Sequence, residues 1–447
     1  MANRSQSRQY FYGEGKPGQE YSRLPRALTA PTARSLEYWA QTRPDAQALV
    51  EATRVNDGRV LSYREWNNYA DQLADTLTDT GLAVGDIVAL RACTRMEWLV
   101  IACAVAKIDA VLLPIDPQLP PGDVRRILID TGAAALICDD AEPRHLAPHL
   151  TGLSFKLRAS IDTSAAGFRN LWDMFPAVAR PRFARSQPAT ITYTARSSGA
   201  LRAVKIPQQR IAPASMSKTP TPEDGVSLIT LAGHHAFGSK QMWQALAAGR
   251  RMALLSDYEP LAALRAIESC GVTQWMDFPD AFQRLTSLDR ARIRSIDLSS
   301  LHSIGVGGGG APVALKAWLV ETFGPIVSQS FGVPETGLIA RLPAEAPAAR
   351  PGTCGRPSHG VIVEIRNPLG QRLPPNAIGE VWARTPESIE RRLIGVGEIE
   401  GLLDENDFIC TGVSGRMDED GFLFLTPFAE NGAPTNHALI RLAGPPL

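Results

Sequence analysis

Residues 191–204 read Ile-Thr-Tyr-Thr-Ala-Arg-Ser-Ser-Gly-Ala-Leu-Arg-Ala-Val, and this stretch has the outline of a phosphate-binding loop. A β-branched run that predicts a strand comes first, and Ser197, Ser198, Gly199 and the cation Arg202 follow it. Hydroxyls and loop amides donate hydrogen bonds to phosphate oxygens, and a nearby cation offsets the phosphate charge. A serine-rich stretch with one glycine is more often an ordinary loop, so the pattern needs support from the rest of the chain.

Short β-type runs alternate with helical patterns on both sides of this stretch, which predicts largely parallel sheets. The predicted strands before residue 350 lie at 87–91, 110–113, 135–138, 190–193, 226–231, 251–255, 272–276, 303–306 and 327–330. The predicted helices lie at 33–42, 71–80, 97–106, 122–130, 240–248, 260–269 and 313–323. After Pro351 the pattern changes to short β runs separated by turns, which predicts a small antiparallel unit.

The predicted fold class is therefore α/β, with two αβα-type subdomains whose sheets are largely parallel and a small antiparallel subdomain resembling a β-barrel. A chain of 447 residues has room for such packed subdomains. The predicted parts are an extended lead-in at 1–32, a first α/β subdomain at 33–185, a second with the phosphate loop at 186–345, a β subdomain at 346–430 and a short irregular tail at 431–447.

Composition excludes several classes of protein. Lys and Arg number 46, as do Asp and Glu, so net charge does not favour nucleic acid or an anionic membrane as partner. The six cysteines have no Cys-x-x-Cys spacing, which argues against a zinc site and a disulfide framework. The first 20 residues lack the apolar core of a signal peptide, and no run of about 18 apolar residues predicts a membrane span. We therefore expect a cytoplasmic protein.

Several segments together carry a resemblance to the adenylate-forming (AMP-binding) ligases, a superfamily of acyl- and aryl-CoA synthetases, peptide-synthetase adenylation domains and luciferases. The opening stretch resembles their phosphate loop, Tyr-Thr-Ser-Gly-Thr-Thr-Gly-x-Pro-Lys-Gly-Val. Further matches occur in the order of that family, at 61–65, 111–130, 235–238, 307–312, 331–335, 351–357, 379–381 and 408–422. Eight matches in order make coincidence a poor explanation.

The resemblance implies a reaction in which a carboxylate attacks the α-phosphorus of ATP, pyrophosphate leaves, and a thiol such as coenzyme A then takes the acyl group. It implies ATP and Mg²⁺ as cofactors, a small-molecule carboxylic acid as substrate, and a separate lid domain or carrier protein as a candidate partner. Arg202 and Glu335 then have catalytic roles, with Glu335 carrying Mg²⁺. The implied nucleotide-binding positions are Ser197, Ser198, Gly199, Gly309, Phe331, Gly332 and Val413, and the implied acyl-pocket positions are His235, Gly307 and Gly308.

Other interpretations of these residues stay open. The phosphate loop can persist without binding a nucleotide, Phe331 can be a core residue instead of an adenine-stacking ring, and Glu335 can be a solvated surface charge. The glycine run can be a flexible turn, and His235 a structural residue without a proton-transfer role.

The chain also departs from the family pattern. Val413 replaces an aspartate that accepts hydrogen bonds from both ribose hydroxyls, which predicts a loss of about 1–3 kcal/mol, or roughly 10- to 100-fold in nucleotide affinity. Arg196 replaces a glycine, and the hinge arginine is missing from residues 427–431. The sequence stops at Leu447, so the family's lid domain with its catalytic lysine is expected to be absent.

These departures favour a ligase-like protein related to acyl-CoA synthetases, with impaired or no independent adenylation. Two alternatives remain: an active or partner-completed acyl- or aryl-acid–AMP ligase, and a non-catalytic binding or scaffold module.

Overall fold

The computed structural model describes residues 33–52, 59–139, 143–162, 164, 167–176, 180–182, 189–195, 201–207, 225–344, 351–386, 392–394 and 404–426. The predicted lead-in at 1–32 and the predicted tail at 431–447 lie outside these residues.

The helices occupy the following bounds: α2 (Ala33–Thr42), α3 (Tyr63–Asp79), α4 (Met96–Lys107), α5 (Pro121–Thr131), α6 (Pro143–Leu146), α7 (Ala236–Ala247), α8 (Pro260–Cys270), α9 (Pro279–Leu285), α10 (Arg290–Arg294) and α11 (Val313–Phe323), with 3-10 turns η2 (Ala147–Leu150) and η3 (Trp172–Met174). The strands up to residue 207 are β1 (Gln47–Glu51), β2 (Val60–Ser62), β3 (Ile87–Arg91), β4 (Val111–Ile115), β5 (Ala135–Cys138), β6 (Leu157–Ser160), β7 (Arg169–Asn170), β8 (Ala189–Ala195) and β9 (Leu201–Pro207). The later strands are β10 (Val226–Ile229), β11 (Arg251–Leu254), β12 (Gln274–Asp277), β13 (Ser303–Val306), β14 (Val327–Val333), β15 (Gly337–Leu342), β16 (Thr353–Pro357), β17 (Ile362–Arg366), β18 (Gly379–Arg384), β19 (Arg392–Ile394), β20 (Ile409–Met417) and β21 (Leu423–Leu425).

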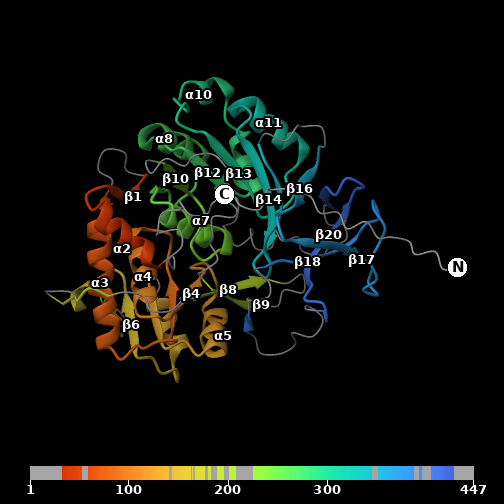
Figure 1. Cartoon of the computed structure of the whole chain (residues 1–447). Coiled ribbons are helices and arrows are strands. Elements are labelled where there is room, and N and C mark those ends of the chain that lie inside the picture. The colour runs from red at the N-terminus through yellow and green to blue at the C-terminus, as the bar shows by residue number, and fades with distance from the viewer. Residues whose placement is uncertain are drawn as a thin grey trace.

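The described strands form two sheets (Figure 1). One has 13 strands in the order β17-β18-β20-β21-β16-β15-β14-β13-β12-β10-β11-β1-β2, and the other has 8 in the order β19-β9-β8-β4-β3-β5-β6-β7. The run β1-β11-β10-β12-β13-β14 is parallel throughout, and so is the run β8-β4-β3-β5-β6-β7. The predicted α/β class with largely parallel sheets is confirmed.

Alternating residues along the strands show how the layers stack. In β3, Val88 and Leu90 pack against α2, α3, α4 and α7, whereas Ala89 faces the cluster that contains α5. In β11, Met252 faces the same four helices, whereas Ala253 faces the cluster of α8, α9 and α11. Since successive side chains of a strand point to opposite faces, the parallel part of each sheet is covered on both sides. In the described part of the chain the order is therefore α5, the 8-stranded sheet, a central helical layer, the 13-stranded sheet and an outer helical layer.

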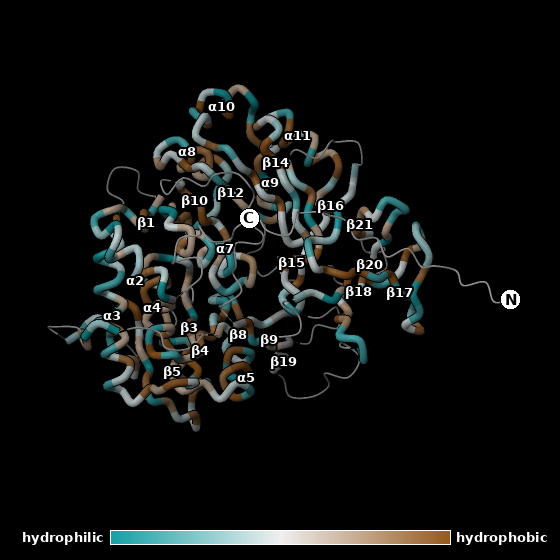
Figure 2. Tube along the Cα trace, viewed as in Figure 1, coloured by the Kyte–Doolittle hydropathy of each residue, from teal (hydrophilic) through white to brown (hydrophobic). Residues whose placement is uncertain are grey.

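The strands after residue 351 are antiparallel, as their turn-rich sequence predicts. They continue the 13-stranded sheet through the pairing of β15 with β16, while β19 pairs with β9 in the other sheet. Figure 2 shows hydrophobic stretches along β18 and β20, which contribute buried residues to the apolar core of this unit. Among the described residues, no helix combines the length and the apolar character that a membrane crossing requires.

Some elements are longer than their apolar pattern indicates. Helix α3 starts at Tyr63, ahead of the predicted 71–80, because Ser62 and Glu65 form a capping box. Strand β14 continues to Val333, beyond the predicted 327–330, because it pairs with β15 in a hairpin. In both cases hydrogen bonds extend the element beyond its hydrophobic run.

Helix α4 lies in the central layer, and all 12 of its residues are buried. Its last residue, Lys107, has a side chain that is 1% exposed, and its ammonium group lies 3.1 Å from the carboxylate of Glu37 and 2.9 Å from that of Asp71. The ammonium also donates to the side-chain oxygen of Asn67 and to the carbonyl of Arg182, both at 3.0 Å. This buried charge cluster joins α2, α3 and α4.

We expect Lys107→Met to lower the free energy of unfolding by about 3–5 kcal/mol, because the change leaves two buried carboxylates without their cation. Lys156→Met is the matched control, since Lys156 is 43% exposed in its ion pair with Asp86 and an exposed pair contributes at most about 1 kcal/mol. Denaturant unfolding of both variants measures the difference. Equal losses would show that the Lys107 cluster does not stabilise the central layer.

Candidate active site

The glycine loop, residues 307–310, follows β13 and lies against two aromatic rings. A Cβ atom added to Gly307 would lie 2.6 Å from Cζ of Phe237, and one added to Gly308 would lie 2.2 Å from Cε1 of Phe278. Gly308 also has φ of +79°, a left-handed conformation that glycine adopts without strain. Glycine is thus required at both positions for the loop to approach the rings this closely.

His235 belongs to the same aromatic group. Its ring centroid lies 5.8 Å from that of Phe278 and 4.5 Å from that of His234, and Phe237 lies 5.7 Å from Phe278. We call His234, His235, Phe237 and Phe278 the aromatic cluster. They stand in the segments that follow β10 and β12, at the carboxyl edge of the parallel sheet, where ligands bind in α/β folds.

Both histidines of this cluster are neutral at physiological pH. Burial lowers the pKa of His235 to about 3, helped by neighbouring His234, and burial lowers the pKa of His234 to about 4. His234 Nε2 lies 3.7 Å from a carboxylate oxygen of Asp116, whose pKa is raised by its own burial. A neutral ring fits both interpretations of His235, as an acyl-pocket residue and as a structural residue without a proton-transfer role.

The segment that contains Gly233, His234 and His235 contacts the residues at the start of α4. The hydroxyl oxygen of Thr94 accepts a 2.7 Å hydrogen bond from the backbone N–H of Gly233, and its carbonyl accepts one of 2.6 Å from the Ser256 hydroxyl. A Cβ on Gly233 would lie 2.5 Å from the ring of Trp98. The start of α4 and the segment that leads into His234 and His235 are therefore in direct contact between the two sheets.

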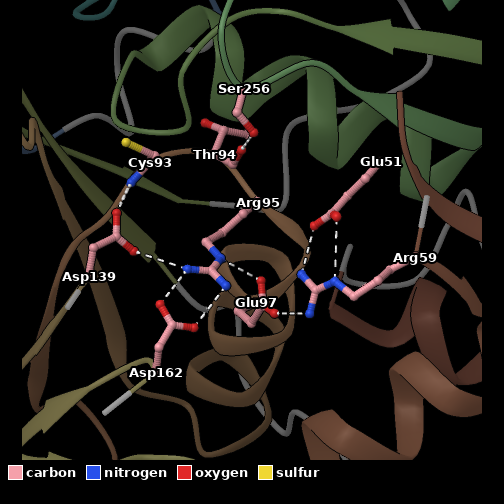
Figure 3. A network of polar contacts seen from close by, with 9 residues as sticks. All are labelled: Glu51, Arg59, Cys93, Thr94, Arg95, Glu97, Asp139, Asp162 and Ser256. Atoms are coloured by element: carbon pink, nitrogen blue, oxygen red, sulfur yellow. Dashed lines mark hydrogen bonds and ion pairs between the residues drawn. The ribbon is translucent and has the colours of Figure 1, made fainter. Parts of the chain in front are cut away.

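An ionic network fixes this same segment (Figure 3). The Arg95 guanidinium donates to both carboxylate oxygens of Asp162, at 2.8 and 2.9 Å, and to Glu97 at 2.7 Å. Arg59 links Glu97 to Glu51 on β1. Burial alone would raise the pKa of Glu97, but the hydrogen bonds from Arg59 and Arg95 outweigh it and lower that pKa to about 2. Ionised side chains from both sheets therefore meet at the start of α4.

The hairpin of β14 and β15 carries three of the predicted site residues. Phe331 is 1% exposed, so in this structure its ring is a core side chain, and adenine stacking by this residue stays a prediction. A Cβ on Gly332 would lie 2.1 Å from the carbonyl oxygen of Gly337 across the hairpin, which explains the glycine. Glu335 lies in the turn that joins the two strands and is 8% exposed, which disfavours a fully solvated surface carboxylate.

Val413 lies in a bulge of β20. Cys410 and Ser414 pair with Trp382 and Glu380, so residues 411–413 stand opposite the single residue Val381. Gly412 has φ of +70°, and the Thr411 hydroxyl donates a 2.8 Å hydrogen bond to the Val381 carbonyl. Bulges of this kind redirect a side chain, often beside active sites. Here the redirected side chain is apolar and 6% exposed.

Phe331 and Val413 share one apolar cluster, the β-unit cluster. Its buried members are Phe331, Val333, Ile339, Ala340, Cys354, Val363, Ile365, Val381, Ala383, Val413 and Leu423. The ribose position predicted from the sequence therefore lies in the same packed unit as the strand that leads to Glu335.

The glycine loop connects the aromatic cluster to the β-unit cluster. The Gln329 side-chain amide donates a 3.3 Å hydrogen bond to the Gly309 carbonyl, and a Cβ on Gly310 would lie 3.6 Å from Leu425. Leu425 packs against the β-unit cluster. The structure therefore brings the predicted positions His235, Gly307, Gly308, Gly309, Phe331, Gly332 and Val413 into one continuous line of contacts.

The predicted phosphate loop is only partly described. Ser197, Ser198 and Gly199 lie outside the described residues, and so does Arg196. Strands β8 and β9, which flank them, form an antiparallel hairpin in which Ala195 pairs with Leu201 and Thr194 with Arg202. The described backbone thus has two paired strands on either side of positions 196–200, and the phosphate contacts of Ser197, Ser198, Gly199 and Arg202 stay predictions.

Glu335 is the residue predicted to carry Mg²⁺. The described residues contain no group of three His, Cys, Asp or Glu side chains that could hold an ion. Mg²⁺ is commonly bound by one or two carboxylates together with substrate phosphates, and a single carboxylate at Glu335 fits that arrangement.

No sequence motif singles out Asp277 as a candidate site residue, although it ends β12 directly before Phe278. Its carboxylate accepts hydrogen bonds from the Thr230 hydroxyl, the Trp275 indole N–H and the Phe278 backbone N–H. Burial raises the pKa of Asp277 to about 6 in spite of these bonds. The available signal was a carboxylate at the end of a hydrophobic strand, next to an aromatic residue.

The chain belongs to the AMP-binding enzyme family, whose sequence pattern matches residues 36–391. It is similar to the fatty acid–[acyl-carrier-protein] ligase ScoC of Streptomyces coeruleorubidus, with 27% identity over 86% of this chain and 77% of that protein. It is also similar to an indoleacetate–CoA ligase of Aromatoleum aromaticum, with 27% identity over 82% of this chain and 73% of that protein. The resemblance to adenylate-forming ligases is confirmed.

Solved structures show the same fold. The amide bond synthetase McbA of Marinactinospora thermotolerans superposes with a TM-score of 0.75 and 23% identity over 89% of this chain and 79% of that one. ATP-bound MatB of Rhodopseudomonas palustris gives 0.74 and 20% identity, over 88% of this chain and 78% of that one.

We expect Asp277 to make the folded state more stable as the pH falls from 7 to 5. Between its ordinary pKa of about 3.9 and its folded pKa of about 6, the folded protein holds a proton that the unfolded chain lacks. Relative to Asp277→Asn, the free energy of unfolding of the unaltered protein should therefore rise by about 1 kcal/mol over this interval. Asp257→Asn, which changes an exposed carboxylate, is the control. Identical pH dependence for the unaltered protein and Asp277→Asn would contradict the expectation.

Proposed function

We propose that this chain binds a carboxylic acid and an adenine nucleotide along the contact line from the aromatic cluster to the β-unit cluster, and that alone it forms acyl-adenylate poorly or not at all. Membership in the AMP-binding family and the named relatives, which act on fatty and indoleacetic acids, support the class of substrate. We propose the impairment because a buried valine, Val413, stands at the predicted ribose position.

Ribose hydroxyls without a hydrogen-bond acceptor are the proposed physical cause of the impairment. The bulge around residue 413 contains Gly412 and the hydrogen bond from Thr411 to the Val381 carbonyl. Its residue 413, however, is a buried valine in the β-unit cluster. Ribose hydroxyls placed against valine have no acceptor there, and an unsatisfied polar group costs about 1–3 kcal/mol. Nucleotide affinity is then the property most affected.

The remaining groups retain their proposed roles. Glu335 would hold Mg²⁺, which supplies charge neutralisation to the phosphate oxygens while pyrophosphate leaves. Arg202 keeps a positive charge in the strand after the phosphate loop, although a planar guanidinium does not reproduce the compact ammonium of lysine. The glycine loop and His235 position the acid. The thiol that would receive an acyl group is coenzyme A or a carrier protein, as the names of the relatives suggest.

We expect the purified chain to catalyse little or no acid-dependent exchange of pyrophosphate with ATP over a panel of fatty and aromatic acids. A thermal-shift titration with Mg·ATP runs in parallel, because it detects binding without chemistry. Stabilisation without exchange would favour a binding module. Robust exchange by the chain alone would contradict the proposed impairment and establish an active acid–AMP ligase.

We expect Val413→Asp to respond to Mg·ATP more strongly than the unaltered protein, with nucleotide binding roughly 10- to 100-fold tighter, because the carboxylate can accept the ribose hydroxyls. Without nucleotide the variant should be less stable, since it buries an unpaired charge. Val363→Asp is the matched control: Val363 is 7% exposed in the same cluster but lies outside the bulge. An equal response to Mg·ATP in the two variants would place the ribose site elsewhere.

A further inference from the structure

Two phenylalanine rings cover the first half of the glycine loop, at Gly307 and Gly308. Phe237 and Phe278 would meet Cβ atoms on Gly307 and Gly308 at 2.6 and 2.2 Å, so both rings contact the loop backbone directly. A Cβ on Gly309 would meet no atom within 4 Å. The glycine loop is therefore covered by rings where it leaves β13, whereas the Cβ side of Gly309 is open and Gly310 faces Leu425.

The backbone segments that carry Phe237 and Phe278 are restrained by their own contacts. Phe278 donates its backbone N–H to Asp277 at 2.7 Å, and Pro279 after it starts helix α9. Phe237 lies in the first turn of α7, where a Cβ on the next residue, Gly238, would lie 2.4 Å from the Ala232 carbonyl oxygen. Neither backbone segment can withdraw from the loop without breaking these contacts.

We propose that Phe237 and Phe278 close the acyl-binding face at Gly307–Gly308 and thereby restrict the acid to small, flat molecules, meaning single-ring aromatic or short-chain acids, while excluding long alkyl chains. This inference rests on the proposed function, in that it takes the acid to bind beside the glycine loop. A long chain passing along the loop would have to displace both rings. A single aromatic ring instead finds edges and faces of Phe278 and the uncharged His235 to pack against.

The test uses cis-parinaric acid, a fluorescent C18 fatty acid, in direct titrations that need neither nucleotide nor catalysis. We expect at least tenfold tighter binding of this probe by Phe237→Ala/Phe278→Ala than by the unaltered chain. Benzoate, titrated by calorimetry, should bind the unaltered chain and bind the double variant more weakly. Phe323→Ala is the matched control, because Phe323 is a partly buried phenylalanine of α11 that packs in a different cluster.

Each outcome decides the matter. Equal parinaric acid binding by the unaltered chain and the double variant would overturn the proposal, and so would absence of binding by both. The single variants Phe237→Ala and Phe278→Ala, with Phe278→Leu as a milder change, replace the double variant if it does not fold. Nucleotide binding and pyrophosphate exchange are measured separately, so failure of the proposed adenylation chemistry is distinguishable from failure of the size restriction.

Discussion

Helix α4 is buried between the two sheets, and its burial limits how the surrounding elements can pack. A helix that is apolar on all sides is stable only where other elements surround it, and here every residue of α4 is buried. Its C-terminal end brings a buried lysine to carboxylates of α2 and α3, and an unpaired charge there would be costly. The two sheets are therefore joined through one central helix and the ionic groups at its ends.

The same helix organises the candidate site. Its N-terminal end is fixed by the network of Arg95, and from there Thr94 and Trp98 hold the segment that leads to His235. A loop that carries site residues is thus anchored to the best-buried element of the fold. Functional loops placed on rigid supports are the common arrangement in α/β proteins, because a positioned side chain needs no reordering on binding. The valine at the predicted ribose position, Val413, lies at the opposite end of the contact line, in the bulge of β20.

Much of the fold was predictable because its signals are local. The alternation of apolar runs and helical patterns locates β13 and α11 at their observed bounds, and the turn-rich sequence after residue 351 indicates antiparallel strands. The apolar pattern alone places the start of helix α3 too late, although its capping residues Ser62 and Glu65 stand in the sequence. For the candidate site, the motif order predicts the positions of His235, the glycine loop, Phe331 and Val413, which remain predictions. It did not identify Asp277 or Phe278, since a carboxylate at a strand end reveals its burial and its partners only after the chain has folded.

The family and the α/β class follow from residue types and from their order along the chain, and so does the prediction that Val413 stands where the family has a ribose-binding aspartate. Which side chains share an environment emerges only in the folded chain. The tertiary structure placed Val413 and Phe331 in one apolar cluster, set Phe237 and Phe278 against Gly307 and Gly308, and joined α4 to the His235 segment. These contacts link residues far apart in the sequence and depend on close packing between layers, so no local pattern encodes them.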